Sequence, residues 1–230
     1  LLAGAWTVRT VTYIPAWRSH TSIFQHMVEV VPSSGRAQWV VGDVRVGEGD
    51  IEQGLYHYRV ALGALGPEYA FLTETARRLI SLQRADAAEP FLERAWDARP
   101  DVSGAASLMA VATAQAQDWP RVAVWARRAV EIEPDDLTAW HLLSTALAEA
   151  GEWAEARSAR ETLIARDPAS PWQQWFWLIE LRARAGDPAG AREAADSARA
   201  RTTASTALAQ IDSVLSALAD PPVADSVASR

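Results

Sequence analysis

The chain has 230 residues, of which 49% are hydrophobic and 22% are charged, and its formal net charge is −7. A chain of this length and hydrophobicity can form a core, so its composition excludes an intrinsically disordered protein. The acidic balance argues against nucleic acid as a partner, because nucleic-acid binding depends on an excess of positive charge facing the phosphates.

Cys, Lys and Asn are absent, so all 22 positive charges are arginines. The absence of Cys excludes disulfides and a cysteine nucleophile, and the absence of Lys excludes Schiff-base catalysis. No phosphate-binding glycine loop or serine-hydrolase motif is present, and none of the four histidines lies in a His-Glu-x-x-His motif. We therefore expect no active site, cofactor or metal in this segment.

The first segment, residues 1–15, begins with an apolar run that Arg9 interrupts. The run is too short to cross a bilayer, which takes about 20 apolar residues. Because the sequence begins with Leu1 rather than Met, we expect it to be part of a longer chain, in which this run is the end of a membrane span or a linker. Residues 16–32 are predicted to form a lead-in helix.

Prolines then recur at a nearly constant interval, at positions 32, 67, 100, 134 and 168, with gaps of 35, 33, 34 and 34 residues. Such a period is typical of a two-helix repeat. Each unit reads as a helix, a short turn, a second helix and the proline. The predicted units are 33–67, 68–100, 101–134, 135–168 and 169–203.

The fourth unit shows the pattern most clearly. Asp135 and Asp136 can cap its first helix, Gly151 begins the turn, and a second helix is predicted from about Trp153 to Arg166. In the next unit Ser170 is expected to be the cap, with a proline at the first helical position, where a missing N–H costs nothing.

Three columns of residues align across the five units. The turn column reads Gly49-Asp50, Ala85-Asp86, Gln117-Asp118, Gly151-Glu152 and Gly186-Asp187. Where paired helices cross closely one residue must be small, and this column reads Gly54, Ala88, Val122, Ala156 and Ala191. Seven residues later, two turns along the same face, stand Ala61, Ala95, Ala129, Leu163 and Ala198.

The chain ends with one more predicted helix, residues 204–219. Leu208, Ile211, Leu215 and Leu218 form one apolar stripe on it, as expected of a helix that covers the open end of a repeat array. Residues 220–230 are predicted to be a flexible tail.

These columns resemble the tetratricopeptide repeat. The best-matching unit runs from Leu137 to Pro168 and carries Trp140, Leu143, Ser144, Leu147, Gly151, Ala156, Leu163 and Pro168. The unit before it has Ala106 where the family usually has Trp, and the last unit has Thr202-Thr203 in place of the closing proline. The resemblance implies an all-α superhelix (α-solenoid) of antiparallel helix pairs without a sheet. A non-repeat helical bundle is the alternative.

The resemblance also implies a non-catalytic scaffold, in which the first helices line a concave face that binds extended peptides or partner helices. Projection of these helices by period predicts which residues face inward. They are Arg36, Trp39, Asp43, Phe71, Glu74, Arg78, Ser107, Val111, Gln115, His141, Thr145, Glu149, Trp172, Trp175 and Ile179.

Two aspects of this face can be anticipated. Aromatic residues at both of its ends, Trp39 with Phe71 and Trp172 with Trp175, are candidate binding anchors, whereas Trp125, Trp140 and Trp177 are expected in the core. At least one of the aromatics between 172 and 177 should be exposed, since they span all sides of a helix. The family's carboxylate clamps and asparagine ladders use Lys and Asn, which are absent here, although Arg36, Arg78 and Arg182 could pair with a carboxylate.

A second resemblance concerns the N-terminal part. Arg9, Trp17, Phe24 and Pro32 match the junction of large membrane proteins that join a multi-spanning glycosyltransferase-like half to a C-terminal tetratricopeptide half. It implies a domain on the extracytoplasmic (periplasmic) side of a bacterial membrane that presents protein partners, with the catalytic residues upstream of Leu1. The alternatives are a free-standing scaffold or adaptor in a periplasmic or cytoplasmic assembly, an enzyme that depends on a residue such as His141, or an inert spacer.

Overall fold

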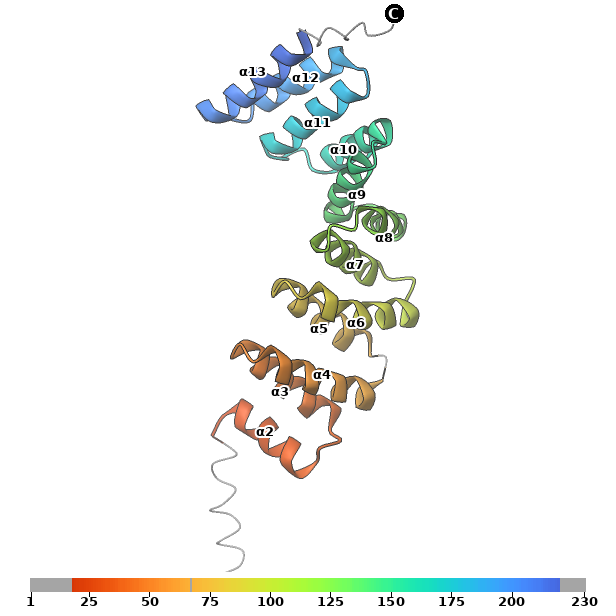
Figure 1. Ribbon diagram of the computed structural model, residues 1–230, viewed down its shortest axis with the longest axis vertical. Coiled ribbons are helices and arrows are strands. Elements are labelled where there is room, and N and C mark those ends of the chain that lie inside the picture. Colours follow the sequence, from red (N-terminus) through yellow and green to blue (C-terminus); the bar gives the residue numbers. More distant parts are fainter. Residues whose placement is uncertain (1–17, 67, 220–230) are drawn as a thin grey trace, which may run out of the picture. The chain divides into compact units, whose positions relative to one another are not determined.

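The computed structural model describes residues 18–66 and 68–219, and these residues form twelve α-helices and no β-strand (Figure 1). The prediction of an all-α fold built from helix pairs is therefore confirmed. None of these helices combines the length and the hydrophobicity that crossing a membrane requires. The predicted end of a membrane span at 1–15, the tail at 220–230 and the proline at 67 lie outside the described residues.

The helices group into two compact units, and the boundary between them in the sequence falls after Pro100. The first unit holds α2 (His20–Val30), α3 (Gly35–Gly47), α4 (Ile51–Leu65), α5 (Tyr69–Ser81) and α6 (Ala85–Ala98). The second holds α7 (Ser103–Gln115), α8 (Trp119–Ile132), α9 (Leu137–Glu149), α10 (Trp153–Arg166), α11 (Trp172–Arg184), α12 (Pro188–Arg199) and α13 (Ser205–Ala219). Within each unit every helix packs mainly on its neighbours in the chain, and α3 to α12 form five pairs.

A residue with positive φ occupies the turn of every pair. These residues are Gly49, Gln83, Gln117, Gly151 and Gly186, with φ between 56° and 87°. Their spacing of 34 or 35 residues repeats the period of the prolines. Four of the five predicted turns are confirmed, but the turn predicted at Ala85-Asp86 is wrong by two residues, because α6 already begins at Ala85 and the chain reverses at Gln83.

The predicted small-residue columns form the seam between paired helices. All ten of these residues are buried, which confirms the prediction. Gly54 shows why the column must be small, since a Cβ added there would lie 2.3 Å from Val46 Cγ2 on the partner helix.

Aspartate side chains begin several helices. Asp136 accepts a hydrogen bond from the backbone N–H of Ala139 at the start of α9, as predicted. The predicted cap at Ser170 is wrong by one residue, because Pro171 stands at the N-cap position of α11 in an extended conformation. The Ser170 hydroxyl instead donates to Asp167 Oδ2 at 3.2 Å.

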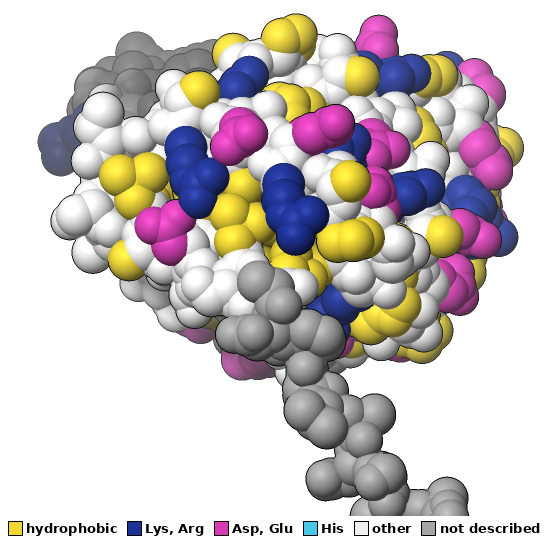
Figure 2. All heavy atoms as spheres, turned by 90° about the horizontal axis from the view of Figure 1, so that it is seen from above, with side chains coloured by type: hydrophobic (Ala, Val, Ile, Leu, Met, Phe, Trp, Pro, Cys, Tyr) yellow, Lys and Arg dark blue, Asp and Glu magenta, His cyan; other side chains and the backbone are white. Residues whose placement is uncertain are grey.

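The last helix, α13, packs on α11 and α12, as the apolar stripe predicts. Ile211 is fully buried in a cluster with Leu178, Ile179 and alanines of α12, and Leu215 and Leu218 pack against the same cluster. The face of the molecule drawn in Figure 2 carries acidic and basic side chains interspersed with hydrophobic ones.

Candidate functional site

In the first unit, an open depression of about 560 Å³ lies between the C-terminal halves of α3 and α5. Four residues predicted to face a partner line it: Trp39, Asp43, Glu74 and Arg78. Phe71 corrects the prediction, since its side chain is fully buried, with its ring edge-on to Trp39 at 5.2 Å between centroids. Phe71 therefore supports the depression from below and offers no surface to a partner.

The charges of this depression are paired with one another. Asp43 accepts a hydrogen bond from Tyr58 Oη at 2.7 Å and lies 3.2 Å from Arg78 Nε, and Glu74 lies 3.5 Å from Arg77 Nε. Burial, followed by the bond to Asp43, raises the pKa of Tyr58 far above its ordinary value, so this phenol remains a donor. The depression is consequently close to neutral.

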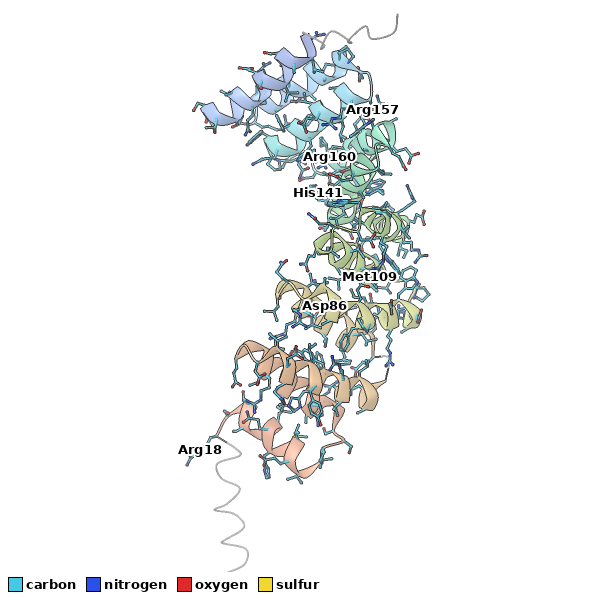
Figure 3. All side chains as sticks on the ribbon, viewed as in Figure 1. Arg18, Asp86, Met109, His141, Arg157 and Arg160 are labelled. Atoms are coloured by element: carbon cyan, nitrogen blue, oxygen red, sulfur yellow. The ribbon has the colours of Figure 1, made fainter. Side chains whose placement is uncertain are left out.

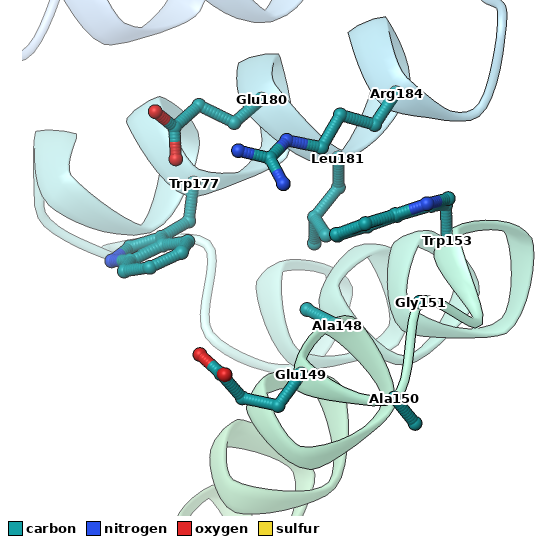
Figure 4. Close-up of a pocket in the computed structure, with 9 residues that line it drawn as sticks. All are labelled: Ala148, Glu149, Ala150, Gly151, Trp153, Trp177, Glu180, Leu181 and Arg184. Carbon is teal, nitrogen blue, oxygen red and sulfur yellow. The ribbon is translucent and has the colours of Figure 1, made fainter.

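A second depression, of about 500 Å³, lies in the second unit between the end of α9 and the face of α11 (Figure 4). The two depressions have the same place in the repeat. Each is lined by the last residue of the first helix of one pair, which is Gly47 or Glu149. Each is also lined by the sixth residue of the first helix of the following pair, which is Glu74 or Trp177. The predicted residue Glu149 lines the second depression. Trp153, Trp177, Glu180 and Arg184 complete its side-chain walls.

The predicted inner face of α11 is wrong in two positions. Trp177, expected in the core, is 43% exposed, whereas Ile179, expected on the inner face, is fully buried. Trp172 and Trp175 are half-buried against the core that α11 shares with α12 and α13. The expectation that at least one aromatic residue between 172 and 177 is exposed is confirmed. The exposed residue is Trp177 rather than Trp172 or Trp175.

The charges of the second depression are not paired. Within the part of the chain that the structure describes, neither Glu149 nor Glu180 forms an ion pair or a side-chain hydrogen bond. The guanidinium of Arg184 lies over the Trp153 ring, 4.7 Å from its centroid, rather than against a carboxylate. The second depression thus differs from the first in charge pairing and in its exposed tryptophan.

A third group of polar residues lies where α9, α10 and α11 meet. Arg160 of α10 is 1% exposed, and its Nη1 donates to His141 Nδ1 at 3.0 Å and to Gln174 Oε1. Burial lowers the pKa of Arg160 to about 10, so the guanidinium remains charged at neutral pH. Burial and then the charge of Arg160 lower the pKa of His141, and Gln174 acts in the opposite direction. His141, predicted to line the binding face, is therefore half-buried within a polar cluster.

The three arginines proposed as carboxylate partners are already used within the chain. Arg36 lies 3.5 Å from Glu68, Arg78 pairs with Asp43, and Arg182 lies 2.9 Å from Glu161. Arg160 and Gln174 are not among the site residues predicted from the sequence. A comparison of columns could have revealed Arg160, because the eighth residue of every other second helix is Tyr, Leu or Ala.

A metal site does not emerge from the described residues, which contain no group of three or more His, Asp or Glu side chains placed to hold an ion. The three polar groups together present aromatic surface, carboxylates, a guanidinium, and amide and imidazole groups.

No protein-family model matches the sequence, and no curated protein matches it. Solved structures share its fold. YrrB, described as a TPR protein with an unusual peptide-binding site, aligns with a TM-score of 0.67 at 16% identity, covering 83% of this chain and 97% of YrrB. PilF of Pseudomonas aeruginosa aligns with a TM-score of 0.61 at 14% identity, covering 91% of this chain and 96% of PilF. PilW, a type IV pilus biogenesis factor, aligns with a TM-score of 0.60 at 13% identity, covering 91% of this chain and 98% of PilW.

Proposed function

We propose that this chain, which has the tetratricopeptide-repeat fold, is a non-catalytic scaffold that binds a peptide segment of a partner protein along its first helices. The observation that carries the proposal is the recurrence of an open depression at the same repeat position in both units. Each unit therefore offers, on its first helices, a position where a peptide can bind. The peptide-binding site named for YrrB supports the same use of the fold.

The second depression is the stronger of the two candidate anchoring points. Trp177, which lines it, is 43% exposed, and tryptophan is enriched among the residues that dominate binding energy at interfaces. Two unpaired carboxylates and one arginine line the same depression and can select among partner side chains by charge. The first depression, with Trp39 and paired charges, is a separate and more apolar candidate within the first unit.

Selection of peptides from a random display library on the whole chain tests the proposal. We expect selected peptides to bind Trp177→Ala at least about tenfold more weakly, since truncation of an aromatic anchor costs about 1.4 kcal/mol or more. Tyr56→Ala is the matched control, because Tyr56 is 56% exposed but lies on α4, a second helix. Failure to select any peptide, or equal binding by Trp177→Ala and the control with matched circular dichroism, would overturn the proposal.

The cellular setting is a separate proposal, which comes from the N-terminal resemblance. In it the chain is the periplasmic domain of a membrane protein of glycosyltransferase type; the alternative is a free-standing scaffold or adaptor. Capture of partners from membrane and soluble extracts, with Trp177→Ala as the reference bait, decides between them. The informative partners are those that the unaltered chain captures and Trp177→Ala does not. If these partners come only from the soluble extract, the membrane setting is contradicted.

A further inference from the structure

A further depression, of about 420 Å³, lies in the second unit between α8 and the turn that joins α9 to α10. We call it the α8–α9 depression. Its main lining residues are the apolar Trp119, Pro120, Ala123 and Val124 of α8 and the acidic Glu149 and Glu152 at the turn. Val124 is 46% exposed, although burial of its side chain would favour folding. The α8–α9 depression therefore keeps apolar surface accessible to a partner.

A small side chain at position 123 leaves room for this depression. Ala123 is the fifth residue of α8, a second helix. The fifth residues of the other second helices are all larger, namely Leu55, Glu89, Arg157 and Arg192. Figure 3 labels Arg157, the equivalent residue on α10.

The following repeat shows which side chain suits this place. Arg157 is half-buried there, and its Nη1 lies 4.0 Å from Asp187 Oδ2. Asp187 is the N-cap residue of α12, as Glu152 is the N-cap residue of α10. Ala123 and Glu152 thus stand where the next repeat has an arginine and its carboxylate, so that the arginine is missing from the α8–α9 depression.

The carboxylates of the α8–α9 depression have no partner in the chain. Neither Glu149 nor Glu152 forms an ion pair or a side-chain hydrogen bond within the residues that the structure describes. The side chain of Glu152 does not cap α10 either. Arg127, which also lines the depression, lies 3.7 Å from Glu155 Oε2. Two negative charges beside the apolar wall therefore remain uncompensated.

We infer that the α8–α9 depression binds an arginine side chain of a partner protein. The methylene stem would pack on the apolar wall of α8, and the guanidinium would reach Glu149 and Glu152, as Arg157 reaches Asp187 in the next repeat. A purely apolar side chain fits less well, because it would take water from the two carboxylates without replacing it. The inference goes beyond the proposed function, since the apolar wall of this site belongs to a second helix.

Short peptides test the inference on the whole chain. An acetylated Gly-Arg-Gly amide presents the arginine side chain without terminal charges, and the corresponding citrulline peptide has nearly the same shape but is neutral. We expect the arginine peptide to shift the NMR signals of the Trp119 indole N–H and the Val124 methyl groups saturably, and the citrulline peptide to leave them nearly unchanged. The response to arginine should weaken as salt is added, because salt screens exposed charges.

Two substitutions of Ala123 place a side chain in the depression. Ala123→Arg supplies within the chain the arginine that α10 has, and Ala123→Gln has the size of Glu89 at the equivalent position of α6 but no charge. Both variants should bind the arginine peptide at least about tenfold more weakly, because the added side chain occupies the site.

A matched pair of neutralising substitutions tests the charge. Glu152 lines the α8–α9 depression and not the second depression, whereas Glu180 lines the second depression and not the α8–α9 depression. We expect Glu152→Gln to bind the arginine peptide about two- to fivefold more weakly, as is typical for loss of an exposed ion pair, and Glu180→Gln to bind it as the unaltered chain does.

Equal responses to the arginine and citrulline peptides, or a response that persists in both Ala123 variants, would overturn the inference. If circular dichroism shows that the Ala123 variants do not fold, the comparison of Glu152→Gln with Glu180→Gln decides the question. Trp177 does not line this depression, so Trp177→Ala should leave the arginine response unchanged. Loss of the arginine response with continued Trp177-dependent peptide binding would overturn only the arginine site, and the reverse result would overturn only the proposed function.

Discussion

Two glutamines, Gln83 and Gln117, adopt the left-handed backbone conformation that glycines adopt at the equivalent turns. A side chain with a Cβ is disfavoured in this region by roughly 1–2 kcal/mol, and only part of that is recovered through the smaller entropy of the unfolded chain. At the scale of single residues, the turn of every pair thus keeps the same backbone conformation, while the amino acid at that position changes between Gly and Gln. The sequence columns locate four of the turns but cannot show that Gln83 is one, because Gln has no general preference for turns.

Replacement of either glutamine by glycine should stabilise the chain. We expect Gln83→Gly and Gln117→Gly each to raise the free energy of unfolding by about 0.5–1 kcal/mol, because the strain at positive φ is removed. Urea denaturation followed by circular dichroism measures the change. The converse substitution Gly151→Ala, at a φ of 77°, should lower the free energy of unfolding, and a stabilising Gly151→Ala would contradict the argument.

The two histidines with lowered pKa values make stability depend on pH. Burial and then Arg45 lower the pKa of His57, and burial and then Arg160 lower that of His141, from an ordinary value of 6.5. The unfolded chain then binds more protons than the folded one, so the stabilisation is complete above pH 6.5 and is lost as pH falls toward the folded pKa values.

Each histidine can contribute at most about 1.4 kcal/mol per pH unit to this loss. We expect the free energy of unfolding to decrease between pH 7 and pH 5, and His141→Gln and His57→Gln each to make the decrease less steep. Urea denaturation at several pH values measures it. Parallel pH profiles of the unaltered chain and both variants would contradict the prediction.

At the scale of helices, the sequence predicts elements where pattern and packing agree. The bounds of α10 and the buried seam follow from the periodicity, because small residues are the only ones that fit a close helix crossing. The register of α11 does not follow, since Trp172, Trp175, Phe176 and Trp177 give no single apolar stripe. The contacts of Leu178 and Ile179 with α12 and α13 decide it and leave Trp177 outside. Hydrophobic periodicity also does not predict that Arg160 is buried, because the method assigns charged residues to the solvent-exposed face of a helix.

The N-cap of α9 provides a test at this scale. Asp136 accepts from the Ala139 N–H at 2.9 Å and also from the Ser107 hydroxyl, so Asp136→Ala should lower the free energy of unfolding by about 1 kcal/mol. Asp135→Ala is the matched control. Asp135 is largely exposed and only forms a surface ion pair with Arg166 at 3.2 Å, whose loss should cost less than about 0.5 kcal/mol. Equal effects in chemical denaturation would exclude the capping role.

At the scale of the whole molecule, each helix depends chiefly on its neighbours in the chain. In such an array stability is close to a sum of local terms, and damage at one place spreads only as far as the packed neighbours. The sequence anticipates this arrangement from its period, but it does not indicate that the array divides into two compact units near residue 100.

Ile211→Ala tests the local character of stability. The substitution empties a fully buried site in the cluster that α11, α12 and α13 share, and comparable truncations cost about 2–5 kcal/mol. We expect amide hydrogen exchange to become faster in α11 to α13 and to stay unchanged in α3 to α6. Faster exchange throughout both units would show that the chain unfolds as a single cooperative body.

Because the ring of Trp177 is exposed, its fluorescence can report on the candidate binding site. It is the most exposed tryptophan that the structure describes, so collisional quenchers should reach its fluorescence first. The unpaired carboxylates of Glu149 and Glu180 should concentrate caesium ions near the indole and repel iodide. A difference between caesium and iodide quenching that disappears when a peptide is added would report occupancy of the second depression without any label.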